Sequence, residues 1–141
     1  MTVIVWDGKV LATDTAATDN AAQWETEKAW EFEGVILSGA GPLQSILAMR
    51  EWYKEGAFPN KFPSVQLTPQ FCHFVVVDPD GLHRYEQGPI PIDHGYYKCA
   101  FGEGKDFAYG ALAMGADAGT AVQIAIDHSV YCGLSVKLYR L

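Results

Sequence analysis

The start of the chain constrains the fold most, because its first eighteen residues predict a β-hairpin. Residues 2–6 are rich in β-branched and aromatic side chains, which suit a pleated strand. The dipeptide Asp7-Gly8 is a signal for a two-residue turn, since glycine adopts positive φ without steric cost. Residues 9–13 then return as the partner strand. The rest of the chain is expected to assemble around this hairpin.

Thr2 lies at the tip of the first strand of this hairpin. Removal of Met1, which the small second side chain favours, would make Thr2 the first residue. A threonine hydroxyl is a weak nucleophile until a base takes its proton, and a free α-amine on the same residue can be that base. The amine titrates near pH ~8, so it is partly neutral at physiological pH. The sequence permits an amino-terminal nucleophile, and the alternative is that Thr2 is an ordinary strand residue.

Four segments in a fixed order extend this observation. They are the hairpin with its continuation Asp14-Thr15-Ala16-Ala17-Thr18, and residues 34–41, 100–112 and 131–139. In sequence and order they resemble proteasome β-subunits and the bacterial HslV-type peptidases, which are N-terminal nucleophile hydrolases. The resemblance is to a short, divergent member of that family. It implies a four-layer αββα sandwich and a threonine-type endopeptidase activity.

The resemblance assigns a reaction centre to residues that are far apart in the sequence. Thr2 matches the nucleophile, Lys28 matches the lysine whose charge favours its deprotonated form, and Asp14 matches the carboxylate that orients this lysine. Gly41 matches the glycine whose N–H stabilises the oxyanion, an effect worth roughly 3 kcal/mol of barrier. Taken singly, these residues have ordinary alternatives: a surface lysine, a strand-ending aspartate, and a glycine required for space.

Four positions match the substrate-binding residues of the same family. Thr18 and Gly39 match positions that pair with an extended substrate backbone. Ala17, Gly39 and Leu43 match positions that line the first specificity pocket. The small side chains among them predict an open, apolar pocket.

The supporting residues depart from the family pattern. The family's Gly-Ser-Gly has Glu103 in place of its serine, close to the expected amine. Near the end of the last helix, Ser129 replaces an aspartate and Cys132 replaces a serine, while Asp127 lies two positions too early. A glutamate beside the amine would favour the protonated amine and weaken it as a base. The alternative function is therefore a catalytically inactive, proteasome-like structural or scaffold subunit, and an amidase acting on a small non-peptide substrate is a third interpretation.

Composition limits the classes of function. The chain has 141 residues, of which 49% are hydrophobic and 19% charged, which is typical of one domain with a substantial core. A net charge of −7 without any basic run argues against a nucleic-acid partner. No apolar stretch reaches the roughly 18 residues of a membrane helix, and no signal peptide is visible. Because the three cysteines have no metal-like spacing, we expect buried thiols and a cytoplasmic location, without membrane contact.

Hydrophobic patterning predicts an α+β domain of stacked antiparallel sheets over residues 1–141. Beyond the first hairpin, strands are expected at residues 30–33, 35–37, 71–77, 82–85, 97–101 and 134–139; helices at 42–55, 107–116 and 120–132, the last ended by Gly133; and irregular stretches at 19–27, 56–70 and 86–95. The family has two helices where this chain has room for one at 42–55. One helix layer should therefore be reduced, and the irregular stretch at 56–70 or a partner subunit should cover the apolar sheet face.

Histidines and cysteines permit two further interpretations. His73 and His83 lie on opposite arms of a predicted hairpin, but no tight cluster of ligands supports a metal site, so single structural histidines are preferred. His128 and Cys132 are four residues apart, which would allow a Cys–His dyad on a helix, although a buried thiol is the usual case. The resemblance implies no metal or organic cofactor, a peptide or unfolded-protein substrate and a homo-oligomer. It does not identify an ATPase partner.

Overall fold

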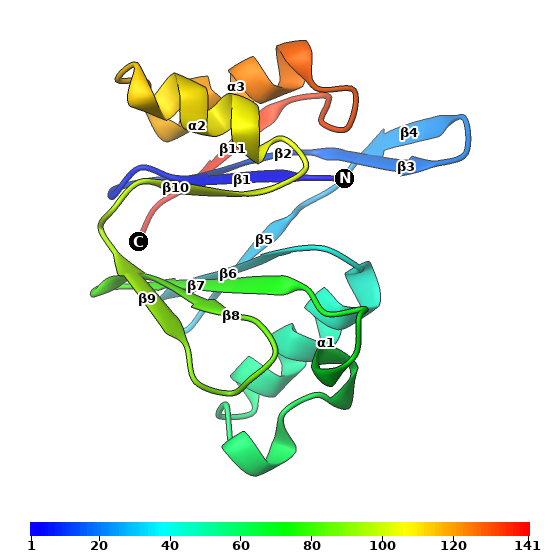
Figure 1. The fold of residues 1–141 in the computed structure, drawn as a ribbon, viewed down its shortest axis with the longest axis vertical. Helices are drawn as coiled ribbons and strands as arrows, with labels where there is room; N and C mark the ends of the chain where they lie inside the picture. Colours follow the sequence, from blue (N-terminus) through cyan, green and yellow to red (C-terminus); the bar gives the residue numbers. More distant parts are fainter.

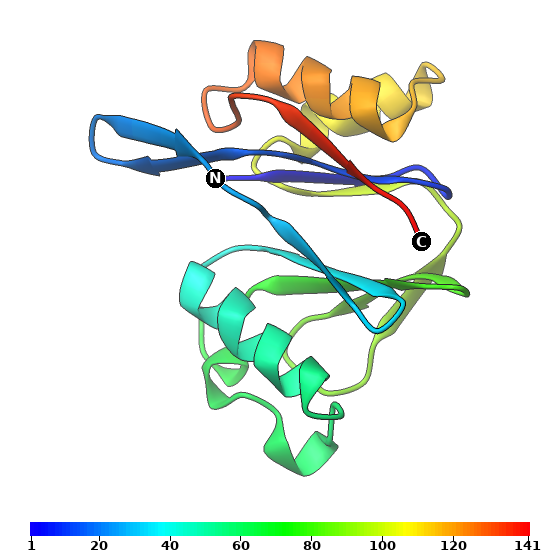
Figure 2. The same ribbon diagram turned by 180° about the vertical axis from the view of Figure 1, so that it is seen from behind.

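Two β-sheets lie face to face in the computed structural model, which describes residues 1–141 (Figure 1). Helices α2 (Lys105–Ala113) and α3 (Ala118–His128) cover the outer side of one sheet. The other sheet is covered by α1 (Leu43–Lys54) and by the short 3-10 helices η1 (Pro59–Lys61) and η2 (Ser64–Leu67) (Figure 2). This is the expected four-layer αββα sandwich, with one helix layer reduced.

The first sheet contains four antiparallel strands in the order β10-β1-β2-β11. They are β1 (Val3–Trp6), β2 (Leu11–Asp14), β10 (Cys99–Gly102) and β11 (Val136–Tyr139). Strand β1 is buried along its whole length, because Val3 and Val5 pack under α2 and α3 while Ile4 and Trp6 face the second sheet. The two-residue period of a strand thus lets β1 join two layers of the core.

The turn of the first hairpin is one residue later than predicted. The Asp7 N–H donates to the Val10 carbonyl at 3.2 Å, so the turn is centred on Gly8 and Lys9. The Asp7 side chain determines this position, because its Oδ1 accepts hydrogen bonds from the N–H groups of Lys9 and Val10. Gly8 has a φ of 93°, the conformation for which glycine was expected.

The second sheet contains five antiparallel strands in the order β5-β6-β7-β8-β9. They are β5 (Ala29–Phe32), β6 (Val35–Ala40), β7 (His73–Asp78), β8 (Gly81–Tyr85) and β9 (Ile92–Gly95). The first four agree with the predicted strands, whereas β9 lies in a stretch predicted as a loop. Strand β9 is a short edge strand that pairs with β8 across an irregularity at Leu82 and His83. Its residues are exposed or half-buried, so its sequence has no alternation of apolar and polar residues that could have predicted a strand.

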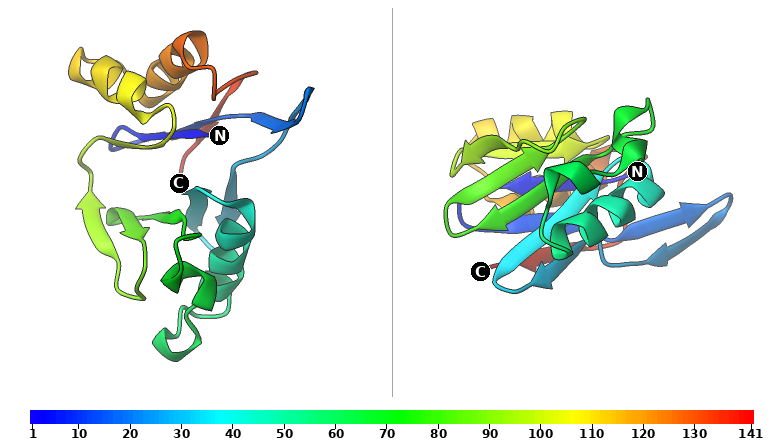
Figure 3. Two further views of the ribbon diagram at one scale, coloured as in Figure 1. Left: turned by 45° about the vertical axis from the view of Figure 1, so that its right-hand side comes forward. Right: turned by 90° about the horizontal axis from the view of Figure 1, so that it is seen from below.

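A third, two-stranded element protrudes from the sandwich. Strand β3 (Ala16–Asp19) pairs with β4 (Ala22–Glu25), and this hairpin extends past the edges of both sheets (Figure 3). The prediction of a loop at 19–27 was wrong for β4. All four residues of β4 are exposed, so polarity hides the strand from an analysis of hydrophobic periodicity.

The helices over the first sheet also differ in detail from the prediction. Helix α2 is not packed on both sides, because Phe107 and Tyr109 are each 44% exposed. Helix α3 ends at His128 rather than at Gly133, and Val130 lies beyond the helix and is almost fully exposed. No helix in the structure is both long enough and apolar enough to cross a bilayer.

The irregular stretch beside α1 is fixed by side chains that bond to the backbone. Gln66 is completely buried and donates from Nε2 to the carbonyls of Cys72 and Glu86 at 2.9 and 2.7 Å. Its Oε1 accepts from the Cys72 N–H at 2.8 Å. Trp52 of α1 donates from Nε1 to the Phe58 carbonyl at 2.9 Å. These bonds hold the stretch over the sheet, where the sequence had led us to expect either this loop or a partner.

Replacing Gln66 with leucine should therefore destabilise the fold. The substitution leaves three buried backbone groups without a partner while keeping the side-chain size, so we expect a loss of about 3 kcal/mol in the free energy of unfolding. Urea unfolding followed by tryptophan fluorescence measures this loss. The matched control is Gln87→Leu, because Gln87 is exposed and its one bond, to the Thr68 carbonyl, is 3.5 Å long. Equal stability of both variants would contradict this account of the loop.

Candidate active site

Asp14 is the buried anchor of the candidate site. It ends β2 and has no exposed surface. Its Oδ1 accepts from Lys28 Nζ at 2.9 Å and from the Val3 N–H at 3.2 Å, and its Oδ2 accepts from the Gly133 N–H at 3.1 Å. The carboxylate is thus fully used, and it ties together the start of β1, the residue before β5 and the loop that follows α3.

Lys28 reaches from this anchor to the start of the chain. Besides Asp14, its Nζ contacts the carbonyl oxygen of Met1 at 2.8 Å. The Lys28 side chain is only 10% exposed, so it is not an ordinary surface lysine. Because the Met1 carbonyl belongs to the peptide bond that joins Met1 to Thr2, the ammonium group lies directly beside Thr2.

Glu103 contacts the backbone nitrogen of Thr2. Its Oε2 accepts from the Thr2 N–H at 2.9 Å and lies 3.9 Å from the Met1 amine. The preceding Gly102 has a φ of 96°, and a Cβ there would lie 2.1 Å from the Thr2 carbonyl oxygen. Glycine at this position therefore allows the loop between β10 and α2 to approach the start of β1. Glu103 thus lies at the Thr2 nitrogen, which would become the amine if Met1 were removed.

A cavity of about 320 Å³ opens beside Thr2. It is bounded by strands β3 and β6 and by the start of α1. The sequence-predicted residues that line it are Thr2, Ala17, Thr18, Lys28, Gly39, Gly41 and Leu43. The structure therefore brings together all four predicted substrate-binding positions with three of the predicted catalytic ones.

Gly41 also has steric reasons to be glycine. Its φ is 132°, and an added Cβ would lie 3.0 Å from the Cα of Cys72. Gly39 is similar, because a Cβ there would lie 2.9 Å from both Cγ atoms of Ile46. The steric explanation for these glycines is therefore correct, and it holds together with their position in the cavity wall.

Part of the cavity wall was missed from the sequence. Trp24, Thr26, Glu27, Trp30 and Ile46 also line it. Trp24 comes from β4, which the sequence analysis treated as a loop, and its side chain is 49% exposed. A tryptophan in an otherwise polar stretch was the signal that could have marked this wall. The cavity is lined by aromatic and charged groups as well as small ones, so it is less apolar than predicted.

Ser129 and Cys132 lie in the segment that follows α3, whose Gly133 N–H bonds to Asp14. Neither residue forms a hydrogen bond to Thr2. Ser129 caps the end of α3, and its Oγ accepts from the Tyr131 N–H at 3.1 Å. Burial, reinforced by the charge of Asp14, raises the pKa of the Cys132 thiol, so this thiol stays protonated. Cys132 belongs to the buried cluster that contains Val3 of β1, so it packs beside the start of that strand.

The alternative Cys–His dyad is not formed. Because α3 ends at His128, Cys132 is not one helical turn away from it. His128 is exposed and stacks on Phe107, whereas Cys132 is buried. Asp127 accepts a hydrogen bond from Gln123 on the exposed surface of α3, away from the start of β1.

Two of the other three histidines contact carboxylates, while His94 packs edge-on against the ring of Phe101. His83 lies 3.0 Å from Asp78 and 3.3 Å from Asp93, and His73 lies 3.2 Å from Glu86. His73 and His83 thus have separate partners. No group of three His, Cys, Asp or Glu side chains is placed to hold a metal ion. All three cysteines are free and buried, and burial raises the pKa values of Cys72 and Cys99 to about 12.

Solved structures share this fold over almost their whole length. HslV from Trypanosoma brucei superposes with a TM-score of 0.69 at 17% identity, covering 98% of this chain and 97% of that chain. BPH from Thiobacillus denitrificans gives a TM-score of 0.75 at 15% identity, covering 100% and 97%. The same protein in complex with epoxomicin gives 0.73 at 14% identity, covering 99% and 97%.

The comparison establishes a class of fold. No protein-family model and no curated protein matches the sequence. The chain has the sandwich fold of HslV and of BPH, as the four sequence segments indicated.

The ion pair between Lys28 and Asp14 should be important for stability. Lys28→Met leaves a buried carboxylate without its counter-charge, which should lower the free energy of unfolding by about 3 kcal/mol at pH 7. Lys98→Met is the matched control, because Lys98 is exposed and forms no ion pair. Urea unfolding of both variants tests the expectation. A change below 0.5 kcal/mol for Lys28→Met would show that the pair is screened by solvent.

Proposed function

We propose that this chain is an N-terminal threonine peptidase, activated by removal of Met1. The observation that carries the proposal is the Lys28 ammonium, which lies between the buried Asp14 carboxylate and the Met1–Thr2 peptide bond, at 2.9 and 2.8 Å. A cation held beside a mature amino-terminal threonine favours the deprotonated forms of its hydroxyl and amine. The shared fold with HslV, and with a BPH solved in complex with epoxomicin, supports this choice.

The residues then have distinct roles in amide hydrolysis. The Thr2 Oγ attacks the carbonyl carbon, and its proton passes to the α-amine of Thr2, which acts as general base. The N–H of Gly41 donates to the oxyanion, which is worth roughly 3 kcal/mol of barrier. The protonated amine gives its proton to the leaving nitrogen, so the C–N bond breaks and an ester on Thr2 is left. Water activated by the same amine hydrolyses the ester.

The resemblance to HslV-type peptidases also suggests how the protein is organised and what it acts on. We propose a single domain over residues 1–141 that works as a homo-oligomer in the cytoplasm on peptides or unfolded proteins. Residues Ala17, Thr18, Gly39 and Leu43 hold the acyl half of the substrate. Cleavage of an unfolded protein, compared with cleavage of small amides, distinguishes a peptidase from an amidase.

The competing function is a scaffold subunit without activity, and two contacts favour it. Glu103 accepts a hydrogen bond from the Thr2 nitrogen, and Lys28 Nζ donates one to the Met1 carbonyl. If Met1 is retained, Thr2 has no free amine and the base is lost. Intact mass measurement of the purified protein decides whether Met1 is present.

An electrophile that adds to an amino-terminal threonine tests the nucleophile directly. A peptide epoxyketone should add its own mass to the wild-type protein at one site and should leave Thr2→Ala unmodified. Thr2→Ser is the matched variant, since it keeps a hydroxyl and a free amine and should still react. Mass spectrometry of the intact protein and its first peptide locates the adduct. A wild-type protein without Met1 that stays unmodified at millimolar reagent would exclude the peptidase.

The Glu103 carboxylate should move the pH dependence of activity. After Met1 removal its negative charge beside the amine favours the protonated amine, which is inactive as a base. Glu103→Gln removes the charge while keeping the size, so the acid limb of kcat/KM should shift to lower pH by roughly one unit. Peptide hydrolysis measured from pH 5 to 10 tests this. A shift to higher pH would mean that the carboxylate helps to remove the proton instead.

A further inference from the structure

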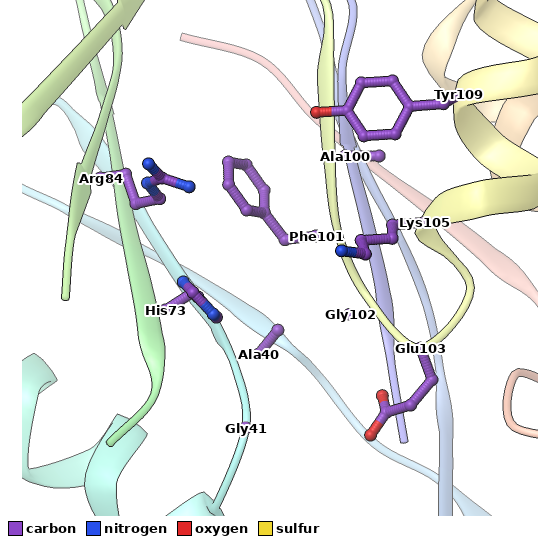
Figure 4. A pocket seen from close by; sticks show the side chains of 10 residues that line it. All are labelled: Ala40, Gly41, His73, Arg84, Ala100, Phe101, Gly102, Glu103, Lys105 and Tyr109. Carbon is purple, nitrogen blue, oxygen red and sulfur yellow. The ribbon is translucent and has the colours of Figure 1, made fainter. Parts of the chain in front are cut away.

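A second cavity, of about 360 Å³, begins where the cavity beside Thr2 ends. Gly41 lines both cavities, and Glu103, which accepts from the Thr2 nitrogen, lines the second one. Figure 4 shows that this cavity lies between the two sheets, with walls from β7 and β8 on one side and from β10 and α2 on the other. The roles proposed so far leave it without an occupant.

Cationic side chains reach into this cavity from both walls. Arg84 from β8 and Lys105 from the start of α2 point toward each other across the ring of Phe101 (Figure 4). The Nε–H of Arg84 is buried without a hydrogen-bond partner. Lys105 forms no ion pair with any carboxylate of the chain.

The carboxylates nearby leave some of these cationic donors unpaired. Glu86 lies 3.4 Å from Arg84 Nη1 and 3.2 Å from His73 Nδ1, the latter a contact without hydrogen-bond geometry. Glu103 is the one acidic side chain in the lining, and it is bonded to the Thr2 N–H. The formal charges of Arg84, Lys105, Glu86 and Glu103 sum to zero, in a protein whose net charge is −7. The cavity therefore repels an anionic group less than the rest of the surface does, and it offers that group the Arg84 Nε–H and the Lys105 ammonium as donors.

The remaining surface suits an extended peptide. Phe101 provides an apolar face, with the Arg84 guanidinium 6.0 Å from its ring centroid. The Tyr109 hydroxyl points toward the same space (Figure 4), which accounts for an aromatic side chain of α2 that is not packed in the core. Arg84, Lys105 and Tyr109 supply hydrogen-bond donors to the lining, and a bond from a cationic donor to a carboxylate is stronger than a bond between neutral groups.

We propose that this second cavity binds the leaving-group half of a peptide substrate and selects an anionic group there. The proposal rests on the proposed function: if the acyl half lies in the cavity with Ala17 and Leu43, the chain beyond the scissile bond passes Gly41 into the cavity that holds Arg84 and Lys105. The anionic group is a carboxylate, supplied either by an acidic side chain or by the free carboxyl terminus of a short peptide.

Binding to the Thr2→Ala variant tests the subsite without any need for turnover. Four octapeptides share the acyl half acetyl-Ala-Ala-Ala-Leu and carry the leaving halves Ser-Glu-Glu-Ala-amide, Ser-Gln-Gln-Ala-amide, Ser-Lys-Lys-Ala-amide and Ser-Gln-Gln-Ala with a free carboxylate. Calorimetry should show that the glutamate peptide binds about five- to tenfold more tightly than the lysine peptide at low salt. The preference should shrink in 1 M salt. The two glutamine peptides show whether a terminal carboxylate is also selected.

Lys105→Glu in the same background should abolish the preference for glutamate. Glutamate suits the first turn of a helix, so α2 should fold normally. Lys98→Glu is the matched control, with the same charge change outside the cavity, and should keep the preference.

Equal affinities for the glutamate and lysine peptides, or a preference that both variants lose equally, would overturn the subsite. Cleavage by the wild-type protein without any preference would overturn the subsite alone, whereas a preference without cleavage would overturn the peptidase alone.

Discussion

A single buried carboxylate, that of Asp14, holds the parts of the chain that form the candidate active site. Asp14 has no exposed surface, yet it accepts hydrogen bonds from Lys28, Val3 and Gly133, which come from three separate parts of the chain. A buried charge is tolerated only when it is paired and its lone pairs are satisfied. The position of the Lys28 ammonium beside Thr2 is thus a requirement of folding, and any catalytic use of it needs no further rearrangement.

Two groups of opposite charge, the Lys28 ammonium and the Glu103 carboxylate, lie beside Thr2. In the peptidase that we propose, the Lys28 ammonium would favour the neutral amine and the deprotonated hydroxyl of a mature Thr2, whereas Glu103, whose Oε2 lies 2.9 Å from the Thr2 nitrogen, would favour the protonated amine. The balance between these two charges would separate a working peptidase from an inert subunit with the same fold. It also explains why a likeness of fold to HslV and BPH does not by itself decide the activity.

The sequence was most informative where local pattern and burial coincide. The first hairpin, α1 and the paired strands β6 and β7 have clear apolar periodicity, and all of them were predicted, the hairpin with its turn one residue too early. Strand β4 and the edge strand β9 are largely exposed, so no periodicity marked them. In the site, Thr2, Asp14 and Lys28 were found through resemblance, whereas Trp24 and Arg84 were not. Both belong to walls that form only when strands distant in sequence are stacked; the isolated tryptophan was a local hint for Trp24, whereas no local pattern marked Arg84.

The protruding hairpin of β3 and β4 has a consequence for the breadth of recognition. It supplies Ala17, Thr18 and Trp24 to the cavity wall, but an isolated two-stranded ribbon has little rigidity of its own. Thr2 and Lys28 are instead held by the stacked sheets, through Asp14 at the end of β2. In the peptidase that we propose, one wall of the substrate cavity would adapt to side chains of different size, while the proposed nucleophile and the Lys28 ammonium would keep their alignment. A flexible wall beside a rigid centre would suit an enzyme that accepts many sequences.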